Sequence, residues 1–364
     1  MTDHDLLADE AKYCSFGDTV HYSDPPRIFE RCEGSYLFDT RGLPYLDLQM
    51  WYSAVNFGYA NPRLNAALRR QIDTLPQVAS QYLHASKIEL AKIVAQDAER
   101  KWGSPGRVHF NVGGSQSIED SLKLVRNAKG GKSLMFAFEG GYHGRTLGAS
   151  AITSSYRYRR RYGHFGDRAY FIPFPYQFRG PKGMTKEEYG MQCVQQFERL
   201  FETEYHGVWD PKVGQCEYAA FYVEAIQGTG GYVIPPLNFF SELKKVLDKY
   251  GVLLVVDEIQ MGFYRTGKLW GIEHFGVDVG CDDTRASVGP RRIEICGNGL
   301  DDDCDGSIDA ADTFCVMPMS DGGAPMHGPL GGDRRSHVVE AQAEIILEVF
   351  EARRDMTLLE LRAK

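Results

Sequence analysis

The chain has 364 residues, 43% of them hydrophobic and 25% charged, and its formal net charge is −8. This length allows two or three domains with a substantial core, and the composition is ordinary for a water-soluble globular protein. The acidic balance argues against nucleic acid as a partner, because few basic residues remain to neutralise phosphates. No apolar run approaches the ~20 residues that cross a bilayer, and the acidic first residues lack the apolar segment of a signal peptide. We therefore expect a cytoplasmic protein without a membrane partner.

In chain order, residues 1–60 are predicted to form an N-terminal arm with short strands. Residues 35–39 and 43–48 flank a turn and indicate a β-hairpin. Amphipathic helices are expected over 62–75 and 87–101.

From residue 108 onward, short apolar strands alternate with helices, which predicts a doubly wound, mostly parallel α/β sheet over residues 61–280. The expected strands are 108–111, 133–138, 169–174, 218–226 and 252–257, and the expected helices are 117–128 and 239–250. Residues 181–215 show no sheet pattern and are interpreted as a helical excursion on the surface.

The most informative stretch is GVLLVVDEIQMGFYRTGK at residues 251–268. Its five consecutive apolar residues favour a central parallel strand that is covered on both faces. The strand ends on Asp257 and Glu258. In open α/β sheets the functional residues lie just beyond the carboxyl ends of the strands, and an acid buried there needs a cationic partner. We therefore expect a functional site at this strand end.

The run DEIQMGFYRTGK resembles the D-E-x-Q-x-G-x-x-R-T-G-K signature of class III pyridoxal-phosphate (PLP) aminotransferases. Similar matches occur in VGGSQ at 112–116, FEGGYHGRTLG at 138–148 and EAIQGTGG at 224–231. The resemblance covers about residues 35–280. It implies the large domain of a fold-type I PLP-transferase, incomplete at its C-terminal end. It also implies PLP as cofactor, an amine or amino acid and a 2-oxo acid as substrates, and a homodimer.

The resemblance implies a cofactor role for five residues. Asp257 would keep the ring nitrogen of PLP protonated, Tyr142 would stack on the ring, and Gln260 would donate a hydrogen bond to the ring hydroxyl. Gly114 and Ser115 would bind the phosphate with backbone N–H groups at the start of a helix.

On the substrate side, the resemblance implies that Arg145 binds a carboxylate, for which a bidentate guanidinium is suited. It places Glu224 on the substrate face of the ring. Taken singly, these positions have structural alternatives: Asp257 as a satisfied acid, Tyr142 as a core aromatic and Arg145 as an ion-pair residue. His143 is interpreted as structural.

The Schiff-base lysine of the family has no counterpart here, so no catalytic residue is identified. In the family it follows R-T-G-K by a few dozen residues in an A-K-x-x-x-G-G context, whereas the only lysine after Lys268 is Lys364. General acid–base catalysis alone contributes ~10²–10⁴-fold, and the covalent contribution would be lost as well. We expect little or no transamination.

Residues 281–316 are rich in Asp and Cys. The run DDDCDGSIDAAD at 301–312 has acids at the alternating positions of a calcium loop, with Gly306 at the turn. The proposed Ca²⁺ ligands are Asp301, Asp303, Asp305, Asp309 and Asp312. The stretch resembles Asp/Cys repeats of secreted bacterial proteins that are described as metal-binding. A disordered acidic linker is the alternative, and zinc is disfavoured because no closely spaced cysteine pair is present.

A disulfide-rich calcium loop contradicts a cytoplasmic enzyme. The simplest hypothesis is a chimera, in which an aminotransferase is interrupted after about Val279 and joined to unrelated sequence. Residues 317–335 are predicted to be a flexible linker, and 336–364 a C-terminal amphipathic helix.

Overall fold

The computed structural model describes residues 2–14, 21, 23–103, 106–163, 165 and 169–277. The chain divides into two compact units with the boundary between Asp73 and Thr74, and each unit is described by itself. The predicted Asp-rich loop at 301–312, the linker at 317–335 and the helix at 336–364 lie outside the described residues.

The first unit contains a three-stranded antiparallel sheet in the order β1-β2-β3. Its elements are α1 (Asp3–Tyr13), β1 (Phe29–Glu33), β2 (Tyr36–Asp39), β3 (Pro44–Leu46) and most of α2 (Pro62–Thr74). The predicted hairpin of β2 and β3 is confirmed, and Asp39 stabilises its turn by accepting hydrogen bonds from the backbone N–H groups of Arg41 and Leu43. The predicted helix at 62–75 is confirmed as α2. Helix α1 was not expected among the short strands of the N-terminal arm; it begins with a capping box between Thr2 and Asp5.

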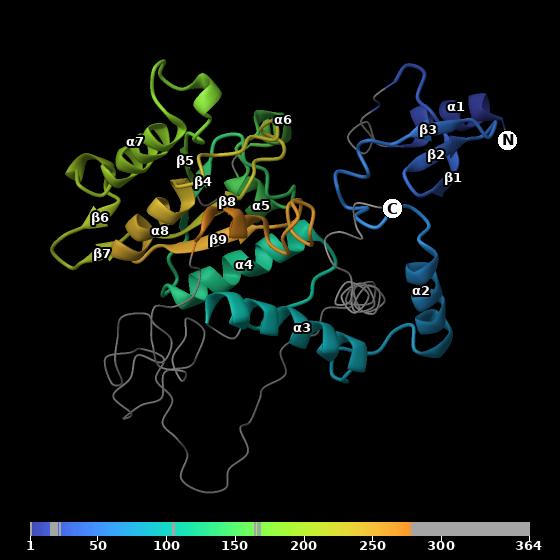
Figure 1. The fold of residues 1–364 in the computed structure, drawn as a ribbon, viewed down its shortest axis with the longest axis horizontal. Helices are drawn as coiled ribbons and strands as arrows, with labels where there is room; N and C mark the ends of the chain where they lie inside the picture. The colour runs from blue at the N-terminus through green and yellow to red at the C-terminus, as the bar shows by residue number, and fades with distance from the viewer. Residues whose placement is uncertain are drawn as a thin grey trace, which may run out of the picture. The chain divides into compact units, whose positions relative to one another are not determined.

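The second unit is built on a parallel four-stranded sheet in the order β5-β4-β8-β9 (Figure 1). Its strands are β4 (Leu134–Phe138), β5 (Ala169–Ile172), β8 (Tyr218–Glu224) and β9 (Leu253–Asp257). The helices are α3 (Ala85–Trp102), α4 (Gly114–Ala128), α5 (Leu147–Ile152), α6 (Tyr156–Arg159), α7 (Lys186–Glu198) and α8 (Phe239–Lys249). The described part also contains three short 3₁₀ helices: η1 (Gln177–Arg179), η2 (Glu204–His206) and η3 (Gly271–Phe275). This architecture confirms the predicted doubly wound α/β sheet.

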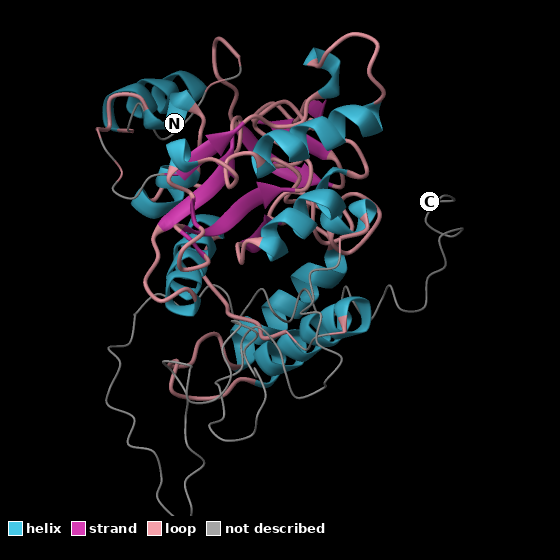
Figure 2. Cartoon of the chain, turned by 90° about the vertical axis from the view of Figure 1, so that its left-hand side faces the viewer, coloured by secondary structure: helices cyan, strands magenta, loops and turns pink. Residues whose placement is uncertain are grey.

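Helices cover both faces of this sheet (Figure 2). Successive side chains of a strand point to opposite faces, so each strand contributes to two cores. In β4, Phe136 and Phe138 belong to the core that includes residues of α7 and α8. Met135 and Ala137 belong to the core on the other face, with residues of α4 and α5. Burial on both faces explains why the strands read as continuous apolar runs.

Two predictions for this unit need correction. The prediction of a strand at 108–111 is wrong. In the described part of the chain these residues pair with no strand, because the described sheet ends at β9, and they lead into α4. The segment 181–215 contains the expected helix, α7, but also enters a two-stranded ribbon of β6 (Trp209–Asp210) and β7 (Gln215–Cys216).

Candidate functional site

Two of the predicted site residues stand at adjacent strand ends. Glu224 is the last residue of β8, Asp257 is the last residue of β9, and the two are register partners in the parallel sheet. Both side chains are buried. Because the carboxyl ends of parallel strands meet at one edge, the loops that follow β4, β8 and β9 converge here.

Asp257 is held by two hydrogen bonds. Its Oδ2 lies 2.9 Å from Nδ1 of His143, and its Oδ1 accepts a hydrogen bond of 3.1 Å from the backbone N–H of Ile259. A carboxylate can only accept, so Nδ1 of His143 carries the hydrogen when Asp257 is ionised. The His143 side chain is only 1% exposed, and its backbone N–H donates to Oγ1 of Thr153 at 2.9 Å. The pair is thus fixed in place, and each carboxylate oxygen can accept a further hydrogen bond.

The sequence indicates only a structural role for His143, and the structure adds its contact with Asp257. The signal that could have revealed it is chemical: a buried acid needs a donor, and His143 follows directly after a residue assigned to the cofactor.

The start of α4 lies against the same edge. Helix α4 begins at Gly114 and buries Ile118, Leu122 and Val125 on one face. The first backbone N–H groups of a helix have no acceptor within it. A Cβ atom on Gly114 would lie 3.3 Å from Cγ1 of Ile259, two residues beyond Asp257. The helix terminus and the acidic strand end are therefore in contact.

The loop after β4 crosses this helix start. Oγ of Ser115 accepts a hydrogen bond of 3.3 Å from the backbone N–H of Arg145. Gly144 has φ +136°, and a Cβ atom on it would collide with Oγ of Ser115. Only glycine allows this close approach of the two segments.

Glu224 joins the loops that follow β4 and β8. Its Oε1 accepts a hydrogen bond from the backbone N–H of Tyr142 at 2.9 Å, and its Oε2 accepts one from that of Gly228 at 2.8 Å. Burial raises the pKa of Glu224 and outweighs the hydrogen bonds that lower it. The Glu224 side chain therefore links the loop after β4 to the loop after β8. Its sequence motif does not predict this role.

Gln260 is placed by the loop after β9. Its Nε2 donates a hydrogen bond of 3.0 Å to Oη of Tyr232. Its amide oxygen fills the space that a side chain at Gly228 would need. Hydrogen bonds join Ser115 to Arg145, Arg145 to Tyr142 and Tyr142 to Glu224. Three other predicted residues, Gly114, Asp257 and Gln260, are connected to this group through intervening residues such as Ile259 and Gly228.

The residues that form this site lie within a match to a known family. The family described as aminotransferase class III matches residues 19–282. The chain belongs to the class III aminotransferase family.

Similar proteins of the family include racemases and aminotransferases. The alanine/serine racemase of Pyrococcus horikoshii is 32% identical over 274 residues, which cover 75% of this chain and 56% of the racemase. The acetylornithine aminotransferase of Archaeoglobus fulgidus is 29% identical over 257 residues, covering 71% of this chain and 59% of the relative. The chain therefore spans a little over half the length of the curated relatives it matches.

Solved transaminase structures share the fold. The (S)-enantioselective omega-transaminase of Thermomicrobium roseum is 30% identical with a TM-score of 0.66, covering 76% of this chain and 61% of that chain. This likeness confirms fold type I for the class III aminotransferase chain. A second family, described as "Putative metal-binding motif", matches residues 281–310, which lie outside the described residues.

The donor set of the class III chain fits PLP. The buried carboxylate of Asp257, held by His143, is an acceptor of the kind that a protonated pyridine nitrogen needs. The N-terminus of α4 offers backbone N–H groups of the kind that bind phosphate. The glycines at 114, 144 and 228 keep Cβ atoms out of the closest approaches between the surrounding segments.

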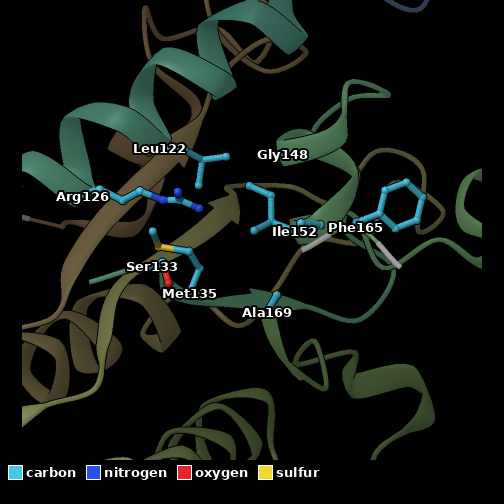
Figure 3. Close-up of a pocket in the computed structure, with 9 residues that line it drawn as sticks. Leu122, Arg126, Ser133, Met135, Gly148, Ile152, Phe165 and Ala169 are labelled. Atoms are coloured by element: carbon cyan, nitrogen blue, oxygen red, sulfur yellow. The ribbon is translucent and has the colours of Figure 1, made fainter. Parts of the chain in front are cut away.

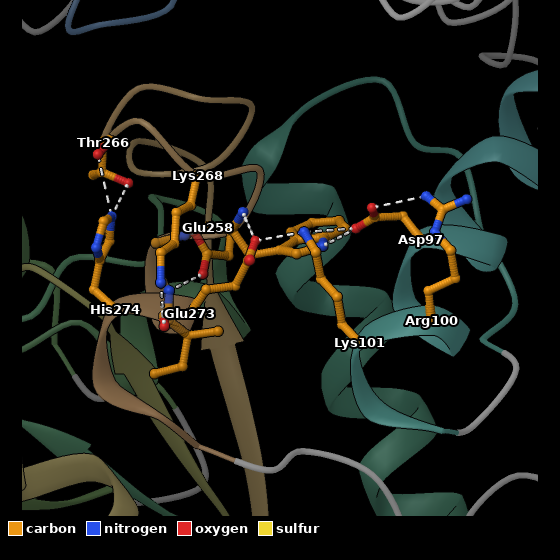
Figure 4. Close-up of polar contacts among 11 residues, drawn as sticks. Asp97, Arg100, Lys101, Glu258, Thr266, Lys268, Glu273 and His274 are labelled. Atoms are coloured by element: carbon orange, nitrogen blue, oxygen red, sulfur yellow. Dashed lines mark hydrogen bonds and ion pairs between the residues drawn. The ribbon is translucent and has the colours of Figure 1, made fainter. Parts of the chain in front are cut away.

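A polar network secures the loop that carries Gln260 in this class III site (Figure 4). Glu258 closes its base, since Oε1 accepts from the backbone N–H of Ile272 and Oε2 from that of Gly271, both at 2.8 Å. Burial raises the pKa of Glu258 despite these two hydrogen bonds. One side chain therefore links both ends of the loop.

The same network ties the end of the loop to α3. Lys101 lies 3.0 Å from Oδ2 of Asp97 and 2.7 Å from Oε1 of Glu273. Nε1 of Trp270 donates to Oδ2 of Asp97 at 3.1 Å. Burial lowers the pKa of Lys101, but the two carboxylates outweigh it and the net pKa is raised. The ammonium is thus charged and anchors the segment.

A small cavity of about 30 Å³ lies apart from this site (Figure 3). It is lined by residues of α4, α5, β4 and β5 and by Phe165, and none of the predicted cofactor or substrate residues lines it.

Among the described residues, no group of His, Cys, Asp and Glu is placed to hold a metal ion. None of the described helices is both long and apolar enough to cross a membrane.

Proposed function

We propose that this chain binds PLP at the carboxyl ends of β8 and β9 and acts on the amino group of an amine or amino acid, with a 2-oxo acid as acceptor. The observation that carries the proposal is the buried pair of Asp257 and His143, in contact through Ile259 with the start of α4. When bound, PLP supplies an electron sink for the carbon that bears the amino group.

The residues of the chain hold and orient the cofactor. Asp257 would accept a hydrogen bond from the N–H of the pyridine ring and so keep that nitrogen protonated, while His143 fixes the carboxylate. Gly114 and Ser115 bind the phosphate, and Tyr142 stacks on the ring. Gln260 donates to the ring hydroxyl. These roles rest on the family match together with the contacts described above.

On the substrate side, Arg145 binds a carboxylate and Glu224 borders the substrate face of the ring. The chain forms a homodimer, as its resemblance to class III aminotransferases implies. Measuring the mass of the particle in solution tests this.

Transamination is impaired in this chain because the proton-shuttling lysine is missing. The support is the sequence itself, in which no lysine stands between Lys268 and Lys364. The aminotransferase match also ends at residue 282, and the match to the metal-binding motif begins at residue 281.

The second candidate function is metal binding by a catalytically inactive chain. It is favoured by the motif match to residues 281–310, and Ca²⁺ would be bound by the acids of 301–312. In that case the aminotransferase part would act as a scaffold, and a chimeric origin would explain the junction near residue 280.

One experiment separates these functions. The purified chain is mixed with PLP, reduced with borohydride and mapped for a modified lysine, while amino transfer to a 2-oxo acid is measured. PLP binding without an adduct, and with little transfer, is the expected result. Failure to bind PLP would contradict the cofactor site. Conversion of an L- to a D-amino acid without a 2-oxo acid would instead indicate racemisation, and stabilisation by Ca²⁺ without PLP binding would favour the second candidate.

A further inference from the structure

The segment after α5 places a tyrosine beside the proposed substrate arginine. The backbone N–H of Ser154 donates to the carbonyl of Gly141 at 3.0 Å, and the Ser154 hydroxyl accepts from the N–H of Gly140. Farther on, the guanidinium of Arg159 lies 5.1 Å from the ring centroid of Phe171, a residue of β5. The short helix α6 is therefore attached at both ends, and Tyr158 lies between these attachments.

Tyr158 contacts two site residues at once. Its ring packs edge-on against that of Tyr142, with centroids 4.9 Å apart and an interplanar angle of 60°. The guanidinium carbon of Arg145 lies over the Tyr158 ring, 5.1 Å from its centroid. Nε of Arg145 also donates to Oη of Tyr142 at 3.3 Å. The arginine is thus held by two aromatic residues from two segments.

We propose that Tyr158 is a specificity-determining residue, which presents the Arg145 guanidinium to the carboxylate of a 2-oxo acid or amino acid. The inference rests on the proposed function, which supplies the carboxylate. Tyr158 acts through Arg145 and is therefore a positioning residue. It received no role from the sequence.

The physical basis is the shape of the guanidinium. The cation–π contact with the Tyr158 ring and the hydrogen bond from Nε to Tyr142 together restrict the positions that the guanidinium can take. A carboxylate would then meet the terminal nitrogens in the bidentate geometry that planar recognition requires. Arg145 is exposed, so loss of the Tyr158 ring would leave its side chain more rotamers and would raise the entropic cost of ordering it on binding.

The test is a double-mutant cycle on ligand binding. The dissociation constant of 2-oxoglutarate is measured by calorimetry for the wild type, Tyr158→Leu, Arg145→Leu and the double variant, each with and without PLP. Tyr158→Phe keeps the ring, and Tyr162→Leu removes a nearby tyrosine that is 73% exposed. Tyr158→Leu is expected to weaken binding about two- to thirtyfold, and the double variant is expected to bind no more weakly than Arg145→Leu. Both control variants should bind 2-oxoglutarate like the wild type.

Three results would overturn the inference: unchanged binding in Tyr158→Leu, a full additive loss in the double variant, or no binding of 2-oxoglutarate by the wild type in either state. A wild type that binds 2-oxoglutarate but not PLP would contradict the proposed function alone, because the cycle is measured without PLP as well.

Discussion

Nδ1 of His143 lies 2.9 Å from Oδ2 of Asp257, although 114 residues separate the two in the sequence. Both side chains are almost fully buried. The imidazole comes from the loop after β4 and the carboxylate from the end of β9, so the contact joins two strand ends across β8, which lies between them. The pair therefore couples the fold of the sheet to the position of the acid on which cofactor binding depends.

Replacing His143 by Leu is expected to destabilise the protein strongly, because Asp257 would keep a buried charge without its partner. Breaking a buried pair in this way costs about 3–5 kcal/mol. Urea denaturation measures the free energy of unfolding. The matched control is His109→Leu, since His109 is 67% exposed and pairs with Asp120 at the surface, where such pairs contribute at most about 1 kcal/mol. Equal effects of the two substitutions would contradict the role given to His143.

Gly144→Ala is expected to destabilise the crossing of the β4 loop over α4. The positive φ of +136° disfavours any Cβ atom, and this one would collide with Ser115. The loss should be about 1–3 kcal/mol, with weaker PLP binding because Ser115 must shift. The control is Gly106→Ala, whose Cβ atom would meet nothing closer than 3.8 Å. A Gly144→Ala variant with native stability and PLP affinity would show that the crossing is not tight.

Glu258 should give the protein a pH-dependent stability. Burial, reinforced by Asp257 and Glu273, raises its pKa above the usual value of 4.5. The folded state then binds a proton more tightly than the unfolded chain does, so this contribution is fully present below pH 4.5 and is lost as the pH rises through the folded pKa. Glu258→Gln cannot titrate.

We therefore expect the wild type to lose stability relative to Glu258→Gln as the pH rises from 4.5 to 7, measured as the difference in Tm between the two proteins. A difference that stays constant, or that changes in the opposite direction, would contradict a raised pKa.

The sequence predicted the parts of the site that follow from local pattern. The apolar run before Asp257 is a parallel strand, and the motif containing Gly114 and Ser115 does open a helix. Apolar periodicity and glycine placement are local properties, so they can be seen in one dimension.

The parts that failed depend on contacts between distant segments. The partner of Asp257 could not be read from spacing, and neither could the bracing of two loops by Glu224. Residues 108–111, expected as a strand, have no regular secondary structure, because a strand requires a neighbour to pair with. The apolar pattern of a segment indicates its tendency to form a strand, whereas the rest of the sheet decides whether it pairs.

The central claim is that Asp257 holds the ring nitrogen of PLP, and an equilibrium titration of PLP into wild type, Asp257→Asn and Asp248→Asn tests it most directly. Asp248 is an exposed acid paired with Lys244 and serves as the control. Loss of a charged hydrogen-bond partner should weaken PLP binding about ten- to hundredfold in Asp257→Asn, while Asp248→Asn binds like the wild type. Wild-type affinity for PLP in Asp257→Asn would contradict the account.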